Sequence, residues 1–539
     1  MMKTPLSLTA AVSVVVMATL ATLSADTLYV SLGSPNPTPP YTAWATAAHS
    51  IQDAVDAAKA GDTVLVTNGV YKVGGRTNGM GSLESRVTIT NCVRLESVDG
   101  PLATTILGGT VVTNEDGQVD RKWGRCVYLG SNAVLSGFTL TEGWQENGGG
   151  VFSEISGVIS NCAISDNLAT SQCGVGGGAY GGTFYNCIFR RNASSGHQDC
   201  GAGGGACGST LYRCTLEENH NGGADSCTLY NCTVSGNSGY CGGASGSTLH
   251  NCVLSGNSGC CGSGASYSTL HNCVLSGNSA GNDGGGAYSS TLYNCVLTGN
   301  SASGYGGGAF GGVLHNCTVV GNSAAVAGGV LGWEWVPCTV INCIVYYNTA
   351  ALGPNYVTHL EPEYAALLQY SCTIPLPTDG VGNVAGPPLL MDVAAGDFRL
   401  REDSPCIDAG TNLLGLPIMG WDVDLNWVPI AHITEPTDIL GNTRFIDGNG
   451  DGKVAWDIGA YEFNSFKPPR FSVQPQLTAD GCWRLNITGA PNKWARLQRS
   501  ANLKDWADFW SGFMGAEGIQ QVNDGDSGQK AMFYRLVVP

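Results

Sequence analysis

Five charged residues in three consecutive repeats of the sequence are the first candidates for chemistry. Asp166, Arg191 and Glu218 each lie four residues after a cysteine of the repeat, and Arg190 and Glu217 lie three residues after one. Carboxylates beside an arginine can supply the acid and the base of a proton-transfer reaction. Opposite charges on adjacent strands can instead set strand register through surface ion pairs. We favour this second, structural interpretation.

A ring-bearing residue stands two positions before the same cysteine in seven repeats. If these side chains point outward, their flat faces could stack against sugar rings. Aromatic residues are also good strand formers that stack on one another. The pattern therefore predicts either a ligand-binding row or a structural stack. The row consists of Tyr185, Tyr212, Tyr230, His250, His271, Tyr293 and His315.

A third candidate lies near the end of the repeat region. Asp447, Asn449 and Asp451 place oxygen ligands at alternate positions, and Gly452 allows the sharp turn of an EF-type calcium loop. The last acid, Asp457, falls at position eleven rather than twelve. The pattern predicts a structural Ca²⁺ of modest affinity, and no other cofactor. The alternative is an Asp- and Gly-rich turn without a metal.

The candidate residues lie in a series of sequence repeats, which must form the elements that position them. Nine cysteines recur 18 to 27 residues apart, each followed five residues later by Asn, and eight of the nine are preceded by Asn. Seven have a small residue eight positions earlier that ends a Gly-rich stretch. This period and composition indicate a β-solenoid. The cysteines are Cys162, Cys187, Cys214, Cys232, Cys252, Cys273, Cys295, Cys317 and Cys343.

The repeat "TLHNCVLSGN" shows how one coil is built. Leu249, Cys252 and Leu254 can all point inward if the chain bends by one residue at Asn251, a residue type that tolerates left-handed backbone. Val253 then points outward. With the Gly-rich strand, each coil has three short strands, which predicts an all-β, right-handed parallel β-helix. Neighbouring ladder cysteines have parallel Cβ vectors, so we expect nine buried thiols rather than disulfides.

The rest of the chain divides around this β-helix. Residues 51–58 form an amphipathic segment that predicts an N-terminal helical cap. The β-helix is expected over residues 26–463, with regular coils at about 150–349 and a closing region at about 396–463, where 396–410 looks like a last coil. Residues 464–469 read as a linker. Residues 470–539 predict a small β-sandwich-like module.

Composition and the N-terminus limit the setting. The chain has 539 residues, a net charge of −17 and only 12% charged residues. The acidic balance argues against nucleic acid and anionic membranes as partners. Lys3, an apolar run at residues 6–23 and small residues before Ala25 predict a signal peptide at residues 1–25. A transmembrane anchor is the alternative, and no other segment could span a bilayer.

The chain resembles the secreted right-handed β-helix proteins of the pectate-lyase-like superfamily, and most closely bacterial proteins with a choice-of-anchor Q ending. The resemblance rests on "IQDAVDAA…GDTVLV", the GGA and NC-x5-N repeats, "SPCIDAG" and "DIGAYEF". It implies a secreted or cell-surface protein but no particular chemistry. Lyases of this fold pair acids, often holding Ca²⁺, with an Arg or Lys base, and hydrolases use two carboxylates.

Loop lengths indicate where a site would lie. Only the interval between the ladder Asn and the GGA stretch varies, so all insertions emerge along one edge. The two longest are residues 168–178 and 193–205. We expect an exported, non-enzymatic protein that binds a polysaccharide or cell-surface glycan. The alternatives are a polysaccharide lyase or glycoside hydrolase that uses the five charged residues, and a purely structural surface protein.

Overall fold

A computed structural model describes most of the chain, in two compact units, Met1–Ser268 and Thr269–Pro539. The described residues are 25–77, 84–113, 119–122, 124–170, 175–195, 203–333, 335–357, 366–412, 417–421, 427–432, 437–449, 453–463, 470–471, 476–477, 483–488, 494–500, 506–513, 519–524 and 533–537. The predicted signal peptide, apart from Ala25, and the predicted linker lie outside them.

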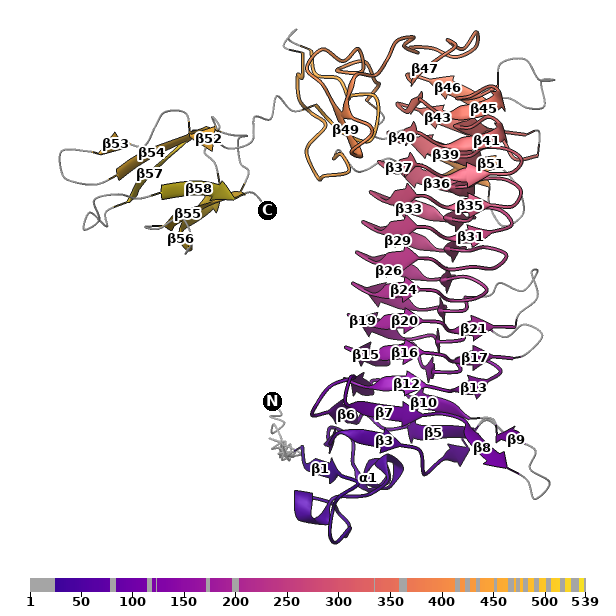
Figure 1. The fold of residues 1–539 in the computed structure, drawn as a ribbon, viewed down its shortest axis with the longest axis vertical. Coiled ribbons are helices and arrows are strands. Elements are labelled where there is room, and N and C mark those ends of the chain that lie inside the picture. The colour runs from indigo at the N-terminus through magenta and orange to yellow at the C-terminus, as the bar shows by residue number, and fades with distance from the viewer. Residues whose placement is uncertain are drawn as a thin grey trace, which may run out of the picture. The chain divides into compact units, whose positions relative to one another are not determined.

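A short helix lies at the N-terminal end of the coils (Figure 1). Helix α1 (Ile51–Ala57) separates β1 (Thr27–Val30) from β2 (Thr63–Val66), and these two strands pair in parallel. Ile51, Ala54 and Val55 are buried, so the apolar face of the helix packs on the first coils. The N-terminal helical cap is confirmed.

The coils of the first unit are stacks of short parallel strands. One face carries the strands that end in the ring-bearing residues: β19 (Thr183–Tyr185), β23 (Thr210–Tyr212), β26 (Thr228–Tyr230) and β29 (Thr248–His250). A second face carries the strands that follow the ladder cysteines: β20 (Ile188–Arg190), β24 (Thr215–Glu217), β27 (Thr233–Ser235) and β30 (Val253–Ser255). All of these pairings are in register, and the predicted all-β, right-handed parallel β-helix is confirmed.

The third face is not formed by the Gly-rich strand that the sequence suggests. It is formed by short strands after the ladder Asn, such as β17 (Leu168–Ala169) and β21 (Ala193–Ser194). The GGA stretches instead lead into the ring-bearing strands. In the second unit the two merge into single seven-residue strands, β36 (Ala287–Tyr293) and β39 (Ala309–His315). The variable loops therefore leave the coil beside this third face.

The bend before each ladder cysteine is made by left-handed backbone. Asn251 has φ 54°, and Arg213, which replaces Asn in its coil, has φ 53°. Leu249, Cys252 and Leu254 are at most 1% exposed, whereas Val253 is 41% exposed. The predicted one-residue change of phase is therefore correct.

The nine ladder cysteines are all described, all buried, and none forms a disulfide. The backbone N–H of Cys214 donates to Sγ of Cys232 at 3.4 Å, and the Cys232 thiol donates to the Leu211 and Tyr230 carbonyls. Each thiol thus fills the interior and also satisfies backbone groups of the adjacent coil. The expected column of buried thiols is confirmed.

The ladder asparagines hold successive coils together. Oδ1 of Asn237 accepts the backbone N–H and the side-chain Nδ2–H of Asn219, both at 2.9 Å. Nδ2 of Asn237 donates to the Leu216 carbonyl and to Oδ1 of Asn257. These asparagines are fully buried. Because every polar atom of the side chain is paired, the column is stable inside the coil.

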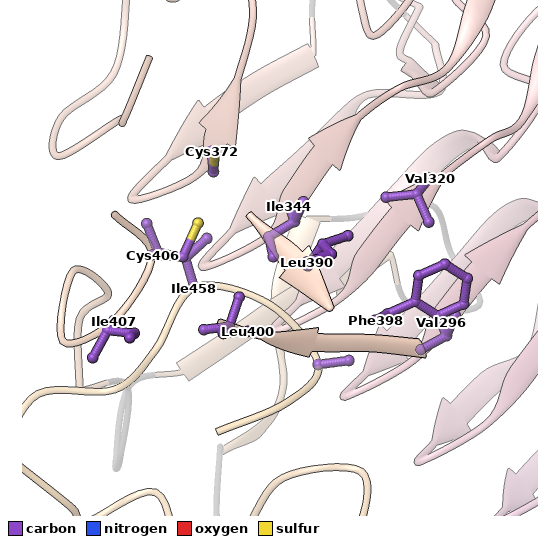
Figure 2. Close-up of a cluster of buried hydrophobic side chains, with 11 residues drawn as sticks. Val296, Val320, Ile344, Cys372, Leu390, Phe398, Leu400, Cys406, Ile407 and Ile458 are labelled. Carbon is purple, nitrogen blue, oxygen red and sulfur yellow. The ribbon is translucent and has the colours of Figure 1, made fainter. Parts of the chain in front are cut away.

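The second unit ends in segments that pack on the outside of its coils. Figure 2 shows Val296, Val320 and Ile344, whose counterparts on the second face of the first unit point outward, beneath Phe398 and Leu400. Cys406 and Ile458 belong to the same cluster. An apolar cover therefore replaces solvent along this face of the second unit.

The segment at residues 396–410 was predicted to be a last coil, and this prediction is wrong. Strand β49 (Asp397–Leu400) pairs antiparallel with β48 (Leu390–Asp392) to form a hairpin. Phe398 and Leu400 are buried while Arg399 is exposed. The hairpin buries its apolar side chains against the outside of the coils. A solenoid strand with the same alternation of apolar and polar residues would bury them inside the coil, so the sequence pattern is the same in both cases.

The C-terminal residues form antiparallel sheets. Strand β54 (Trp483–Thr488) pairs with β57 (Ile519–Asp524), and β55 (Trp494–Ser500) pairs with β56 (Ala507–Phe513) and β58 (Phe533–Val537). These antiparallel strands are consistent with the predicted β-rich module. Within the described part of the chain, no helix has the length and hydropathy needed to cross a membrane.

Candidate functional site

The ring-bearing row of the first unit is a continuous stack. Tyr185, Tyr212, Tyr230 and His250 follow one another with ring centroids 4.9 Å apart and interplanar angles of 6° to 8°. The in-register strands place each ring directly over the next. Because neighbouring rings cover one another's faces, only their edges reach solvent. The row therefore does not offer open ring faces along its length for stacking on sugars.

What the row does offer is hydroxyl groups. Tyr185, Tyr212 and Tyr230 are partly exposed, and none of their hydroxyls has a hydrogen-bond partner among the described residues. Two positions earlier on the same face of each strand lies a partly exposed threonine. These threonines are Thr183, Thr210, Thr228 and Thr248. The face is a grid of hydroxyls at the spacing of the coils.

The row of the second unit behaves differently, because two of its members continue the stack but are covered by another segment of the chain. Tyr293 is 8% exposed and His315 is 5% exposed. Trp456 packs against Tyr293, and burial lowers the pKa of His315 to about 4. Both are covered because residues 437–449 and 453–463, here called the closing segment, fold over this face. His271 stays partly exposed and stacks on Tyr293 at 4.8 Å.

The five charged residues do come together on the outer surface of the first unit. Arg191 forms two hydrogen bonds to the Asp166 carboxylate, both at 2.8 Å. Arg190 forms two to Glu218, at 3.0 and 3.2 Å, and lies 3.5 Å from Glu217. The sequence therefore predicted the cluster correctly, and each arginine is occupied by a carboxylate of an adjacent coil.

The electrostatics of this cluster favour ion pairing over acid–base catalysis. Hydrogen bonding to Glu218 raises the pKa of Arg190, and hydrogen bonding to Asp166 raises the pKa of Arg191. The pKa of Glu218 is lowered by its hydrogen bond from Arg190. A catalytic base needs a pKa moved toward neutrality, usually by burial. These shifts go the opposite way, in side chains that are open to water.

Three residues of the cluster have left-handed backbone conformations, which are unfavourable for their side chains. Asp166, Arg191 and Glu218 have φ between 50° and 57°, at a position where the next coils have Gly236 and Gly256 with φ near 61°. Left-handed backbone disfavours side chains such as Arg and Glu. Three consecutive coils therefore retain charged side chains at a position where glycine is easier to accommodate.

Asp457, the last residue of the predicted calcium set, is taken up by backbone contacts. Asp457 is fully buried, and its Oδ1 and Oδ2 accept the backbone N–H groups of Asp408 and Phe463. Burial raises its pKa to about 7. Asn449 donates its backbone N–H to Asp408, and Asp451 lies outside the described residues. Asp457 therefore does not fit the last ligand position.

The calcium site predicted at Asp447, Asn449, Asp451 and Asp457 stays a prediction. Among the residues that the structure describes, no three His, Cys, Asp or Glu side chains are grouped to hold a metal. Cys173, His197, Asp199 and Cys200, in the two longest insertions, are also outside the described residues.

One buried cation was missed by the sequence analysis. Arg125, at the start of β10 (Arg125–Leu129), is 1% exposed, and its Nε and Nη1 have no hydrogen-bond partner among the residues that the structure describes. Its Nη2 donates to the Asn147 carbonyl, and its guanidinium lies 5.0 Å from the Phe152 ring centroid. Burial lowers its pKa to about 10. The sequence feature that could have indicated it is a single arginine beside the apolar residues of one predicted strand.

Comparisons with known proteins find similar solved structures, all at low similarity. No protein-family model and no curated protein sequence matches the chain. The chain is similar to the solved structure of XylC in complex with xylose, with 10% identity, a TM-score of 0.38, and coverage of 81% of this chain and 98% of that one. It is also similar to pectate lyase Pel9A, with 14% identity, a TM-score of 0.33 and coverage of 82% and 97%.

A tailspike protein is a further similar solved structure. The Dettilon tailspike protein has 8% identity, a TM-score of 0.32, and coverage of 95% of this chain and 93% of that one. Similarity at this level establishes neither a family nor an activity for the chain.

Proposed function

We propose that this chain is an exported, non-enzymatic β-helix protein that binds polysaccharide through the hydroxyl grid of its first unit. The observation that supports this most directly is the row Tyr185, Tyr212 and Tyr230, with unpartnered hydroxyls repeated at each coil. A polysaccharide presents its own hydroxyls at regular intervals, so hydrogen bonds can form in parallel along the row. Many weak, regularly spaced contacts give retention without a catalytic group.

The mode of binding follows from the stacking. Since the ring faces cover one another, hydrogen bonding through the hydroxyls of the row replaces the face-on stacking that the sequence suggested. A neutral polysaccharide suits an acidic protein better than an anionic one unless a cation bridges the charges. The module at residues 470–539 and the predicted anchor-type ending are assigned to attachment at the cell surface.

The test uses variants that keep the stack and remove the hydroxyls. Tyr212→Phe with Tyr230→Phe leaves both rings in place, and we expect the chain from Asp26 to lose about tenfold or more in affinity for a retained polysaccharide, at about 1 kcal/mol for each hydrogen bond. The measurement is affinity electrophoresis on neutral and acidic polysaccharides, with and without Ca²⁺.

The control is Tyr293→Phe, because Tyr293 belongs to the same repeat position but is buried. It should leave retention unchanged. Equal retention by the Tyr212/Tyr230 variant and the unmodified chain would contradict the proposal.

The second candidate is a polysaccharide lyase or glycoside hydrolase centred on the charged cluster. It is favoured by one observation, the charged side chains kept at left-handed positions of Arg191 and Glu218. Backbone strain of this kind collects at functional sites. Release of unsaturated or reducing ends in the same assay, abolished by Arg190→Ala with Arg191→Ala, would replace the binding proposal with the enzymatic one.

A further inference from the structure

Three turn cysteines of the first unit differ from the buried ladder, and Cys92, far from them in sequence, is exposed as well. Cys241, Cys260 and Cys261 lie in the two adjacent turns that precede GGA-type strands, and all three are partly exposed. Ladder Cys252, by contrast, is 1% exposed, and its thiol donates to the Leu229 and His250 carbonyls. Small reagents can therefore reach the turn cysteines in the folded chain, whereas the ladder is sealed.

Backbone contacts hold the two turns together. The Cys260 N–H donates to the Tyr240 carbonyl at 2.9 Å, and Ser238 pairs with Ser258 in parallel. A Cβ added at Gly259 would lie 2.9 Å from the Tyr240 oxygen and from the Gly242 nitrogen. The turns are thus packed as tightly as a glycine allows, which fixes the thiols in place.

The thiols of Cys260 and Cys261 are already neighbours, with Sγ atoms 3.5 Å apart. A disulfide needs a bond of about 2.0 Å, so a small rotation of the side chains brings the sulfurs together. Adjacent Cα atoms are about 3.8 Å apart, which is below the usual Cα separation in disulfides of about 4.4 to 6.8 Å. The resulting bond would be strained and easily reduced, as in labile, regulatory disulfides.

We propose that Cys260 and Cys261 are a reversible oxidation site, closed to a disulfide by small-molecule disulfides. One thiolate of the pair attacks the reagent disulfide, forms a mixed disulfide and expels one reagent thiol. The second thiolate then attacks the protein sulfur of the mixed disulfide and expels the other. Two protein thiols become one disulfide, and their two protons and two electrons leave on the two reagent thiols.

The third cysteine is a poorer competitor. Burial raises the pKa of Cys241, so less of it is present as the reactive thiolate. This proposal is independent of polysaccharide binding.

The experiment treats the folded chain with oxidised glutathione, blocks remaining thiols with iodoacetamide and maps the peptides without reduction. We expect the peptide that contains both Cys260 and Cys261 to lose two hydrogen atoms, and the reduced form to return with reduced glutathione. In Cys260→Ser, glutathione should remain attached to Cys261, because no second thiol releases it.

The ladder supplies the internal control, since Cys252 should become reactive only after unfolding. Alkylation of both Cys260 and Cys261 after oxidation would overturn the proposal. So would a disulfide between Cys241 and either of them, or a bond that reduced glutathione does not open.

Discussion

Arg444 and Glu462 form an ion pair that water does not reach. Nη1 of Arg444 lies 3.1 Å from Oε2 of Glu462, with side-chain exposures of 0% and 1%. Burial raises the pKa of Glu462 to about 9 and that of neighbouring Asp457 to about 7. One arginine thus faces two acids inside the closing segment, and a proton is easier to bury there than a second negative charge.

This arrangement predicts that the closing segment is less stable at high pH. The folded pKa values lie above the usual range of about 4, so between about pH 4 and pH 9 the folded state holds protons that the unfolded state has released. Its stability therefore decreases as pH rises through this window. The measurement is the thermal unfolding midpoint between pH 5.5 and pH 8.5.

Glu462→Gln provides the matched control for that prediction. The amide keeps an oxygen for Arg444 and cannot titrate, so the decrease in midpoint across the window should be smaller than in the unmodified chain. An equal decrease in both proteins would assign the pH dependence to other groups.

At the scale of elements, the asparagine column decides whether the coils stay stacked. Asn237 makes hydrogen bonds with the coils on both sides, and each of its partners is buried. Removing this side chain therefore leaves several polar groups without partners in the interior. A buried group left unsatisfied costs about 1–3 kcal/mol.

We predict that Asn237→Leu lowers the free energy of unfolding by at least about 3 kcal/mol, since the leucine fills the space but pairs with none of these groups. Chemical denaturation gives the value. Ser235→Ala, on the outer face of the neighbouring β27, should change it by less than about 0.5 kcal/mol. Similar effects for the two variants would mean that the column does not hold the coils.

The bends show how much of each coil was predictable. Asn251 and its equivalents made the bend predictable, since few residues other than Gly adopt positive φ. Arg213 makes the same bend although it is not Asn, because β23 in its coil pairs in register with β19 and β26 of the adjacent coils. The self-stacking of Tyr212 and Tyr230 was one of two predicted outcomes, and only the in-register strands selected it.

At the scale of the whole molecule, cleavage of the predicted signal peptide would set the N-terminus. Strand β1 starts at Thr27, and the backbone nitrogen of Asp26 donates to the Asp62 carboxylate at 2.9 Å. Cleavage after Ala25 would turn this nitrogen into an ammonium group and the contact into an ion pair. The mature end would then be tied to the first coil.

We predict that the chain exported from a bacterial host begins at Asp26, and N-terminal sequencing of the secreted protein checks this. A chain that starts at Asp26 without residues 1–25 should stay inside the cell. Recovery of the full-length chain from membranes would support the anchor alternative instead.

The sequence by itself determined the coil, the buried cysteine and asparagine columns, and the charged cluster. These features depend on contacts between neighbouring repeats, so the motif that recurs in each repeat predicts them. The tertiary structure decided which of the ring-bearing residues are exposed, and it turned residues 390–400 into a hairpin. Arg444 contacts Asn294 across 150 positions of sequence, and no period predicts such a contact. The closing segment therefore covers Tyr293 and His315, and leaves the grid in the first unit as the exposed surface proposed for binding.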